Sequence, residues 1–497
     1  MESISHLLQG LTIALQPENL FLCFIGVLVG TLVGVLPGLG ANAAIALLLP
    51  ITFKIPPVGA VIMLAGIYYG AAYGGSTTSI LINIPGEAAS VITCVDGHQM
   101  ALKGRAGPAL GMAAFSSFIA GTFGVIMLVF MAPRLAKLAL LFGPPEYCGL
   151  MAMSLCLITF LSGGSMVKAL IMAALGLFLG TIGTDQQTAK LRFVYGSSYL
   201  SDGIPLVPLV MGLFGISEVL RNLGKSEGRE VLNSKIKSFL PNLQDWRDSA
   251  FPIVRGTVIG FLMGLIPGIG LATPTFVAYG VEKRLSKHPE KFGTGVIEGV
   301  ASPEACNNAT ASGLFIPLLS LGIPGSAAMA LFLGALMIYG LEPGPLLIQN
   351  HPDVFWGVVA SMYVGNVMLL ILNLPLIPLW VKVLKIPYYL LFPLILIFCI
   401  IGAYTLNNNV GDIIIMITFG IIGYIFSGLK YELPPLILAF VLGPMFEMEL
   451  RRSLAISRGS FAIFFTRPIA GSFLFLAFLI LVAPLVVGTI RKLLPNE

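Results

Sequence analysis

Two proline-glycine motifs each occur twice in this chain, in the same order. GVLPGLG at 34–40 recurs as GLIPGIG at 264–270, and NIPGEAAS at 83–90 recurs as GIPGSAAM at 322–329. Both pairs lie within long apolar stretches, where proline removes a backbone donor and glycine adds conformational freedom. The pattern predicts helices that break at matching places in two related halves, with one site formed from both.

The composition restricts the chain to one class. Of its 497 residues 57% are hydrophobic and only 10% are charged, against about a quarter charged in a soluble domain. Apolar runs long enough to cross a bilayer recur from 19–53 to 468–490. They predict an all-α polytopic membrane protein with about 11–12 transmembrane segments. The net charge of +5 comes from basic loop residues, so it reports on topology and not on nucleic-acid binding.

The most polar stretch, 221–255, divides the chain near its midpoint and carries seven Lys/Arg residues. We interpret it as a cytoplasmic linker between a first membrane repeat, 1–220, and a second repeat with C-terminal helices, 256–497. The segment 1–53 contains no Lys or Arg, whereas the second repeat begins directly after Arg255. This contrast favours inverted-topology repeats over parallel ones.

Segment 256–282 lies between Arg255 and a basic cluster that begins at Lys283. If both flanks are cytoplasmic, the segment enters and leaves on one side, yet two full crossings need about 40 residues. We therefore expect a re-entrant hairpin with Pro267 and Gly268 at its tip. One ordinary kinked helix is the alternative. The matching segment 19–53 could form the same kind of hairpin.

Enzymatic interpretations find little support. The four histidines are far apart and form no HExxH motif, and GGSTTS at 74–79 lacks the lysine of a phosphate loop. The six cysteines have no CxxC spacing, so neither a metal site nor a disulfide framework is indicated. The sequence predicts transport and not catalysis, with no cofactor beyond a coupling ion.

The first helix break follows a cluster of hydroxyl groups, and Ile84-Pro85-Gly86 comes directly after it. A break at membrane depth exposes carbonyl and amide groups, which is tolerated where they line a cavity or bind a ligand. Half-helix N-termini attract carboxylates, while carbonyls and hydroxyls suit sodium. Serine and threonine also commonly bond to their own helix. Glu87 could carry a cation or a proton, although its position after the break favours a simple interaction with the helix dipole.

The second break contains asparagines where the first contains hydroxyls. Aligning Pro85-Gly86 with Pro324-Gly325 also brings Gly74 onto Gly313, and Asn307 and Asn308 follow shortly after Glu304. An asparagine pair in an apolar setting is either functional or joins neighbouring helices, and we favour function. The break motifs contain no Lys or Arg, so an anionic substrate would be held by amides, hydroxyls, asparagines and a co-bound cation.

The sequence resembles the large membrane subunit of the tripartite tricarboxylate transporters over nearly its whole length. The resemblance rests on GVLPGLGANAA (34–44), YYGAAYGGSTTSILINIPGEAASV (68–91), DGHQMALKGRAGPALG (96–111), VEKRLSKHPEKFGTGVIEGVASPEACNNATASG (281–313), LGIPGSAAMALFLGAL (321–336) and ELRRSLAISRGSFAIFFTRPIA (449–470). It implies a secondary transporter of a bacterial inner membrane that works with a small four-helix membrane subunit and a periplasmic solute-binding protein. It also implies citrate-like carboxylates as substrates and a sodium or proton gradient as the driving force.

We place substrate and ion at the breaks and their polar neighbours. The candidates for substrate binding are Gly38, Gly40, Asn42, Ser76, Thr77, Pro85, Gly86, Pro267, Gly268, Gly270, Asn307, Asn308, Pro324, Gly325 and Ser326. The candidates for ion binding are Thr78, Ser79, Asn83, Thr310 and Ser312.

The expected function is therefore import of a small di- or tricarboxylate by alternating access. Cys306, Thr310 and Ser312 stand where the resemblance leads us to expect mostly alanine, so the preferred substrate could differ from citrate. A channel-like or exporting role is the alternative within transport. A membrane scaffold or assembly subunit that transports nothing is the alternative from another class.

Overall fold

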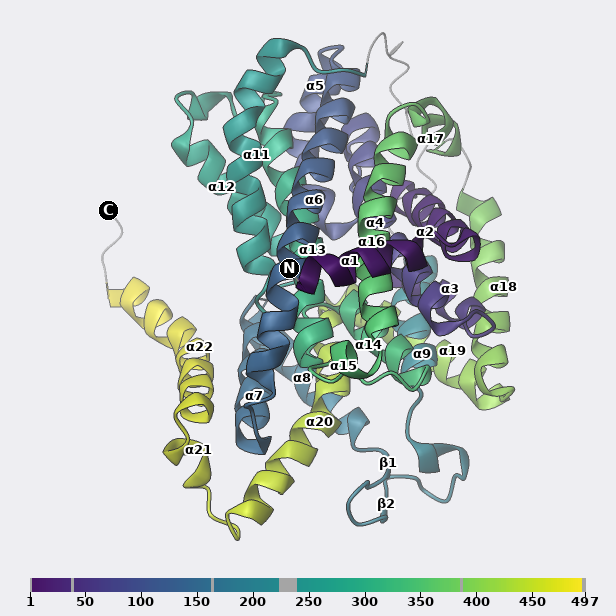
Figure 1. Ribbon diagram of the computed structural model, residues 1–497, viewed down its shortest axis with the longest axis vertical. Helices are drawn as coiled ribbons and strands as arrows, with labels where there is room; N and C mark the ends of the chain where they lie inside the picture. Colours follow the sequence, from purple (N-terminus) through teal and green to yellow (C-terminus); the bar gives the residue numbers. More distant parts are fainter. Residues whose placement is uncertain (1, 37–39, 162–164, 223–238, 385–387, 494–497) are drawn as a thin grey trace. The chain divides into compact units, whose positions relative to one another are not determined.

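The computed structural model describes residues 2–36, 40–161, 165–222, 239–384 and 388–493, and these are almost entirely helical (Figure 1). The predicted all-α class is confirmed. The longer helices are α1 (Glu2–Ala14), α2 (Pro17–Val35), α3 (Gly40–Thr52), α4 (Pro57–Ile82), α6 (Ala106–Ala139), α7 (Pro144–Leu161), α8 (Met166–Gly180), α11 (Leu243–Gly264), α12 (Ala272–Leu285), α13 (Glu298–Leu321), α14 (Ala327–Ile338), α16 (Pro352–Asn373), α18 (Tyr388–Asn407), α19 (Val410–Gly428), α20 (Pro434–Ile456) and α22 (Pro468–Leu493).

Short elements connect these helices. They are η1 (Ala88–Val91), η2 (Cys94–His98), α5 (Gln99–Leu102), η3 (Tyr199–Asp202), α9 (Leu206–Val210), η4 (Met211–Ile216), α10 (Ser217–Asn222), η5 (Pro289–Lys291), α15 (Leu347–Asn350), α17 (Ile377–Leu384) and α21 (Ile463–Thr466). Strands β1 (Gly183–Thr184) and β2 (Leu191–Arg192) form an antiparallel pair in which Gly183 lies opposite Arg192.

Several helices are long and apolar enough to cross a membrane. Within the described part of the chain, five meet both criteria: α2, α4, α6, α16 and α19. The chain is thus a multi-pass membrane protein, as predicted. The number of crossings stays a prediction.

The chain forms two compact units, Met1–Ala136 with Leu206–Tyr424, and Lys137–Pro205 with Ile425–Glu497. Both proline-glycine motif pairs belong to the first unit. The division of the chain at 221–255 stays a prediction. Part of that proposed linker, 223–238, lies outside the described residues, and α11 begins at Leu243.

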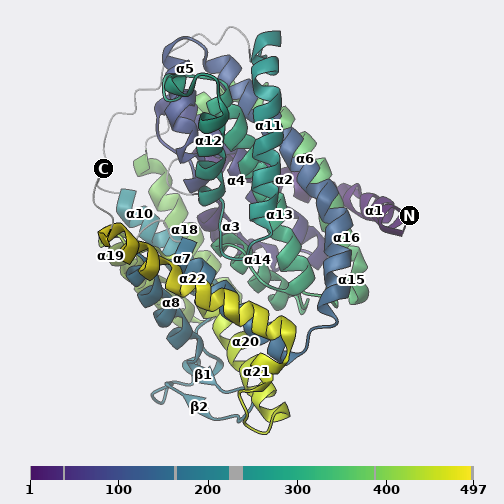
Figure 2. The same cartoon turned by 90° about the vertical axis from the view of Figure 1, so that its left-hand side faces the viewer.

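In the second half, α11 packs against α13 through three glycines spaced four residues apart. A Cβ atom on Gly256, Gly260 or Gly264 would lie 2.2, 2.2 or 2.8 Å from the carbonyl oxygens of Ser302, Cys306 and Thr310, respectively. Such distances leave no room for a side chain, so the glycines allow the two backbones to approach closely. Both views show α11, α12 and α13 side by side (Figure 1, Figure 2).

The first half repeats this packing between α2 and α4. A Cβ atom on Gly26, Gly30 or Gly34 would lie 2.4 Å from the carbonyl oxygens of Met63, Ile67 and Ala71. The reverse contacts also match, since Gly74 approaches the Thr31 carbonyl and Gly313 approaches the Phe261 carbonyl. The alignment of Gly74 with Gly313 is therefore confirmed.

The hairpin predicted at 256–282 is present. Helices α11 and α12 are joined by 265–271, and away from this tip Arg255 Nη2 lies 2.5 Å from Glu282 Oε1. The single kinked helix is therefore wrong. With 14 residues, α12 is about 21 Å long, shorter than the roughly 30 Å apolar core of a bilayer. This length suits a re-entrant arm, although its depth in a membrane stays a prediction.

The broken helices of the two halves, α4 and α13, run antiparallel. Tyr69 Oη donates to Ser312 Oγ, and Ser76 Oγ donates to Glu304 Oε2. The later residue of α4 thus contacts the earlier residue of α13, as it must when two helices run in opposite directions. Because α4 and α13 are equivalent elements, their antiparallel packing is the relation expected of inverted repeats.

In the second unit, α20 packs against α7 and α8. A Cβ atom on Gly176 of α8 would lie 2.1 Å from the Leu436 carbonyl oxygen of α20, again a close backbone approach. Arg467 lies 3.2 Å from the buried Glu146, and Arg451 lies 2.9 Å from Asp185 beside the strand pair. These ion pairs join segments that are far apart in the sequence.

One buried carboxylate joins the two halves of the first unit. Asp96 in η2 accepts hydrogen bonds from the backbone N–H groups of Gly293, Gly295 and Val296, at 2.7 to 3.1 Å, and from Tyr279 Oη at 2.8 Å. Its side chain is fully buried. Several donors thus stabilise the buried carboxylate and fix the loop before α13.

We expect Asp96→Ala to lower the free energy of unfolding by about 2–4 kcal/mol, because it leaves several buried N–H groups without an acceptor. Thermal unfolding of the purified protein measures the loss. Asp248→Asn, a change at an exposed surface position, serves as the control. Equal stability of the Asp96 and Asp248 variants would contradict the proposed role of Asp96.

Candidate functional site

Both IPG motifs interrupt a helix. In the first half, α4 ends at Ile82 and Asn83 adopts a left-handed conformation with φ 56° before the chain resumes at η1. In the second half, α13 ends at Leu321 and Gly322 adopts φ 73° before α14 begins at Ala327. Asparagine and glycine are the residues that tolerate this conformation. The breaks therefore follow from local sequence.

In the second half, the tip of the hairpin lies against the helix break of the same half. The N–H groups of Gly268 and Gly270 donate to the Gly325 carbonyl oxygen at 3.1 and 3.3 Å. In the first half, a Cβ on Gly86 would lie 2.1 Å from the Gly34 carbonyl oxygen. The second break therefore contacts the PGxG tip, whereas the first break contacts the end of α2, and Gly38 of the first PGxG motif lies outside the described residues.

A buried carboxyl group connects the halves beside the first break. Glu304 of α13 accepts hydrogen bonds from Ser76 Oγ of α4 at 2.6 Å and from Thr93 Oγ1, which follows the break, at 2.5 Å. Glu304 is 1% exposed, and both hydroxyl residues are also buried. The hydrogen bonds link α13 to segments on both sides of the break in α4.

A second buried carboxyl group, Glu87, lies within the first break. Asn307 Nδ2 of α13 donates to Glu87 Oε1 at 3.3 Å and lies 3.5 Å from the Ala72 carbonyl oxygen. Among the residues that the structure describes, the amide oxygens of Asn307 and Asn308 are buried and have no hydrogen-bond partner. Glu87 thus interacts with the opposite half and not only with its own short helix.

Tyrosines of α4 extend this polar network. Tyr69 Oη donates to Ser312 Oγ at 2.9 Å, and Tyr73 Oη donates to Asn366 Oδ1 of α16 at 2.5 Å. Asn366 in turn donates to Thr122 Oγ1 of α6 at 2.9 Å. The network therefore joins α4, α6, α13 and α16.

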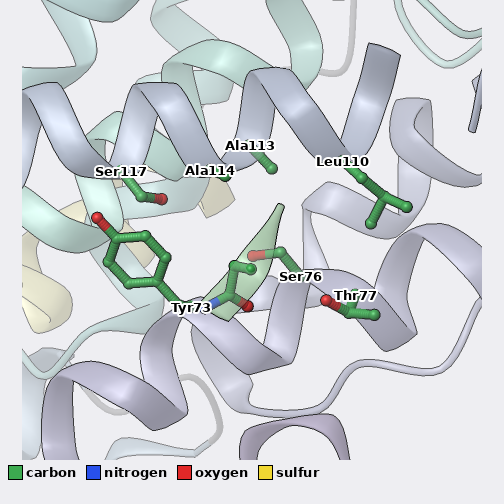
Figure 3. A pocket seen from close by; sticks show the side chains of 8 residues that line it. Tyr73, Ser76, Thr77, Leu110, Ala113, Ala114 and Ser117 are labelled. Atoms are coloured by element: carbon green, nitrogen blue, oxygen red, sulfur yellow. The ribbon is translucent and has the colours of Figure 1, made fainter. Parts of the chain in front are cut away.

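A small cavity lies beside Ser76 (Figure 3). Tyr73, Ser76 and Thr77 of α4 face it from one side and Ser117 of α6 from the other, together with Leu110, Ala113, Ala114 and Asn373. Its volume is about 10 Å³, counted as the space that the centre of a water-sized sphere can occupy. A cavity needs roughly 10–15 Å³ by this measure to hold one water molecule, so in this conformation it is too small for a tricarboxylate.

The structure brings several candidates together and gives others backbone partners. Ser76, Thr77 and Asn307 lie at the cavity or the carboxyl groups, and Ser312 belongs to the tyrosine network. Asn83 ends α4, while Asn42 is half-buried in α3. The hydroxyls of Thr78 and Ser79 donate to the Gly75 carbonyl, Thr310 donates to the Gly260 carbonyl, and Ser326 caps α14 by accepting from Met329 N. Gly38 lies outside the described residues. All these site assignments stay predictions.

The sequence reasoning missed the residues that complete the network. Glu304 was noted only as a neighbour of the asparagines, and Glu87 was interpreted as a helix-dipole residue. Tyr69, Tyr73 and Asn366 were not selected, although polar groups within apolar helices are a recognisable signal. Three glycines at four-residue spacing in 26–34 and 256–264 were a second such signal.

Comparisons with known proteins agree with these features. The chain matches the Tripartite tricarboxylate transporter TctA family over residues 20–438. It is 51% identical, over 474 residues, to an uncharacterized 52.8 kDa protein in the TAR-I ttuC' 3' region of Agrobacterium vitis, covering 95% of this chain and 94% of the relative. It is also 54% identical over 215 residues to an uncharacterized protein in the TAR-II ttuC' 3' region of Agrobacterium vitis, covering 43% of this chain and 89% of the relative. No solved structure matches.

Proposed function

The chain belongs to the tripartite tricarboxylate transporter TctA family, and from this premise we propose that it is the subunit that moves a small di- or tricarboxylate, citrate-like in character, into the cell. The proposed location is a bacterial inner membrane. A periplasmic solute-binding protein delivers the substrate, a small four-helix membrane subunit accompanies the chain, and a sodium or proton gradient drives uptake.

The observation that carries this proposal is the duplicated break. Two helices from opposite halves are interrupted at equivalent places, pack antiparallel, and share buried polar side chains through Ser76, Glu304 and Asn307. Inverted repeats with discontinuous helices are typical of secondary transporters that bind substrate near the middle of the membrane. Alternating access then consists of one half moving against the other.

The site can hold an anion without a basic side chain. Ser76, Thr77 and Ser117 line the cavity, and the N-terminus of α14 lies at the second break. Donors of this kind bind carboxylates reversibly. The narrow cavity fits a state in which access from either side is closed.

The scaffold alternative predicts that this polar network serves assembly alone. Replacing the buried hydroxyls and carboxyls would then reduce transport by the complex only where assembly of the complex is also lost. These groups lie beside the first break, where they join the two halves, and not on an outer face, which favours the transport proposal.

Reconstituted uptake tests the proposal. The three-subunit complex is placed in proteoliposomes, and labelled di- and tricarboxylates are supplied outside under an imposed sodium or proton gradient. We expect accumulation that requires one of the gradients. Uptake that depends on neither gradient would contradict secondary transport, and an assembled complex that transports none of these compounds would favour the scaffold.

A further inference from the structure

Glu87 and Glu304 are buried carboxyl groups that have no basic partner among the residues that the structure describes. In the described part of the chain, the ion pairs belong to other carboxylates: Glu146, Asp185, Glu218, Asp245, Glu282, Glu290, Glu447 and Glu449. A carboxylate buried in this way is strongly unfavourable unless a proton or another cation neutralises it. Asp96 is also buried without an ion pair in the described part of the chain, but four donors stabilise its charge, whereas Glu304 accepts from Ser76 and Thr93 and Glu87 from Asn307. A proton or another cation would therefore stabilise Glu87 and Glu304.

The hydrogen-bond partners of both groups suit a carboxyl that gains and loses a proton. Ser76 and Thr93 contact Glu304 through hydroxyls, which donate to a carboxylate and accept from a carboxylic acid. Asn307 contacts Glu87 through its amide, whose oxygen is buried and has no partner within the described residues. Rotation of this amide would present the oxygen to a protonated Glu87.

The two carboxyl groups lie close to the cavity. Ser76 both lines the cavity and donates to Glu304, and the Glu87 side chain packs over the neighbouring Gly75, where a Cβ would lie 2.9 Å from Glu87 Cγ. A substrate carboxylate that entered this cavity would meet two like charges if both groups were ionised. Protonation removes that repulsion.

We propose that Glu304 and Glu87 form the coupling site and that the transported cation is a proton. Each carboxyl group takes up one proton on its oxygen as the substrate enters, and releases it on the other side as the substrate leaves. No other bond is formed or broken. The proposal rests on the transport function proposed above and specifies its driving ion.

The titratable groups near Glu304 and Glu87 do not supply a positive charge that could take the place of the proton. Tyr73 of α4 and Cys94 of η2 lie near enough to Glu304 to interact with it electrostatically, and Tyr68 of α4 does so with Glu87. All three are neutral acids near neutral pH, so they supply no positive charge.

Counting protons per substrate tests the proposal. The three-subunit complex is reconstituted in proteoliposomes that contain a pH-sensitive dye, and an inward gradient of labelled citrate is applied. The measured quantity is the ratio of protons to citrate molecules that enter. We expect Glu304→Gln to lower this ratio by one and Glu304→Asp to restore it. Glu146→Gln, which alters a buried carboxyl paired with Arg467, leaves the ratio unchanged.

A second variant keeps the carboxyl and changes only its environment. Thr93→Val removes one donor to the charged form of Glu304, so the pH at which uptake falls to half shifts upward by about one unit. An unchanged proton ratio in Glu304→Gln, or an unchanged pH midpoint in Thr93→Val, would overturn the coupling site, as would uptake driven by sodium alone. Those outcomes leave wild-type uptake intact, whereas failure of the proposed function removes uptake from the wild type itself.

Discussion

Replacing Gly260 with valine is expected to separate α11 from α13 and to remove the folded protein from detergent extracts. Even the first side-chain carbon would lie 2.2 Å from the Cys306 carbonyl oxygen, and this obstacle is backbone that cannot rotate away. Overpacking of this kind destabilises by about 3 kcal/mol. The hairpin tip would also lose its position beside Gly325. We therefore expect transport to be lost together with the stability of the protein. Fluorescence-detected size exclusion and thermal unfolding measure both losses.

Gly280 provides a matched control. It lies in α12 of the same hairpin, and a Cβ there would meet nothing within 4 Å. Gly280→Val therefore leaves the elution profile and the melting temperature close to the wild-type values. Equal behaviour of the Gly260 and Gly280 variants would contradict the close helix contact. The same comparison applies to Gly30, which occupies the equivalent place in the first half.

Replacing Asn307 with alanine is expected to reduce carboxylate uptake at least tenfold, corresponding to about 1.4 kcal/mol, while the complex still assembles. The substitution removes the donor to Glu87 Oε1 and leaves that buried carboxyl without its partner from the other half. Initial uptake rates measure the effect. Pull-down of the small membrane subunit shows whether assembly persists.

Asn350 is the control for this substitution, because it is an exposed asparagine at the end of α15. We expect Asn350→Ala to transport at the wild-type rate. Normal uptake by Asn307→Ala would remove Asn307 from the site. Loss of assembly together with loss of uptake would support the scaffold alternative instead.

Local patterns in the sequence predicted much of the architecture. Proline and glycine within apolar runs located both helix breaks, because their backbone restrictions act without tertiary context. Charge on both flanks of 256–282 predicted the hairpin that Arg255 and Glu282 hold together. The alignment of Gly74 with Gly313 was also correct, since both glycines make equivalent close contacts.

The site could be predicted only in part, because its contacts join residues far apart in the chain. Ser76 and Glu304 are separated by 228 residues, and no local pattern shows that they meet. Thr78 and Ser79 were chosen as ion ligands for their hydroxyls, yet these bond to backbone carbonyls. Which hydroxyls of a cluster point toward a cavity depends on how α4 is rotated against its neighbours. The close contacts of Gly26, Gly30 and Gly34 of α2 with α4 fix that rotation.

Binding of citrate to the purified protein tests most directly whether the two breaks form one site. Isothermal titration with citrate is carried out on the wild type, on Thr77→Val in the first half and on Asn307→Ala in the second. We predict one citrate bound per chain in the wild type, and a substantially weaker affinity when either half is altered. Two independent binding sites, or normal affinity after a change in one of the halves, would contradict a single site shared by both.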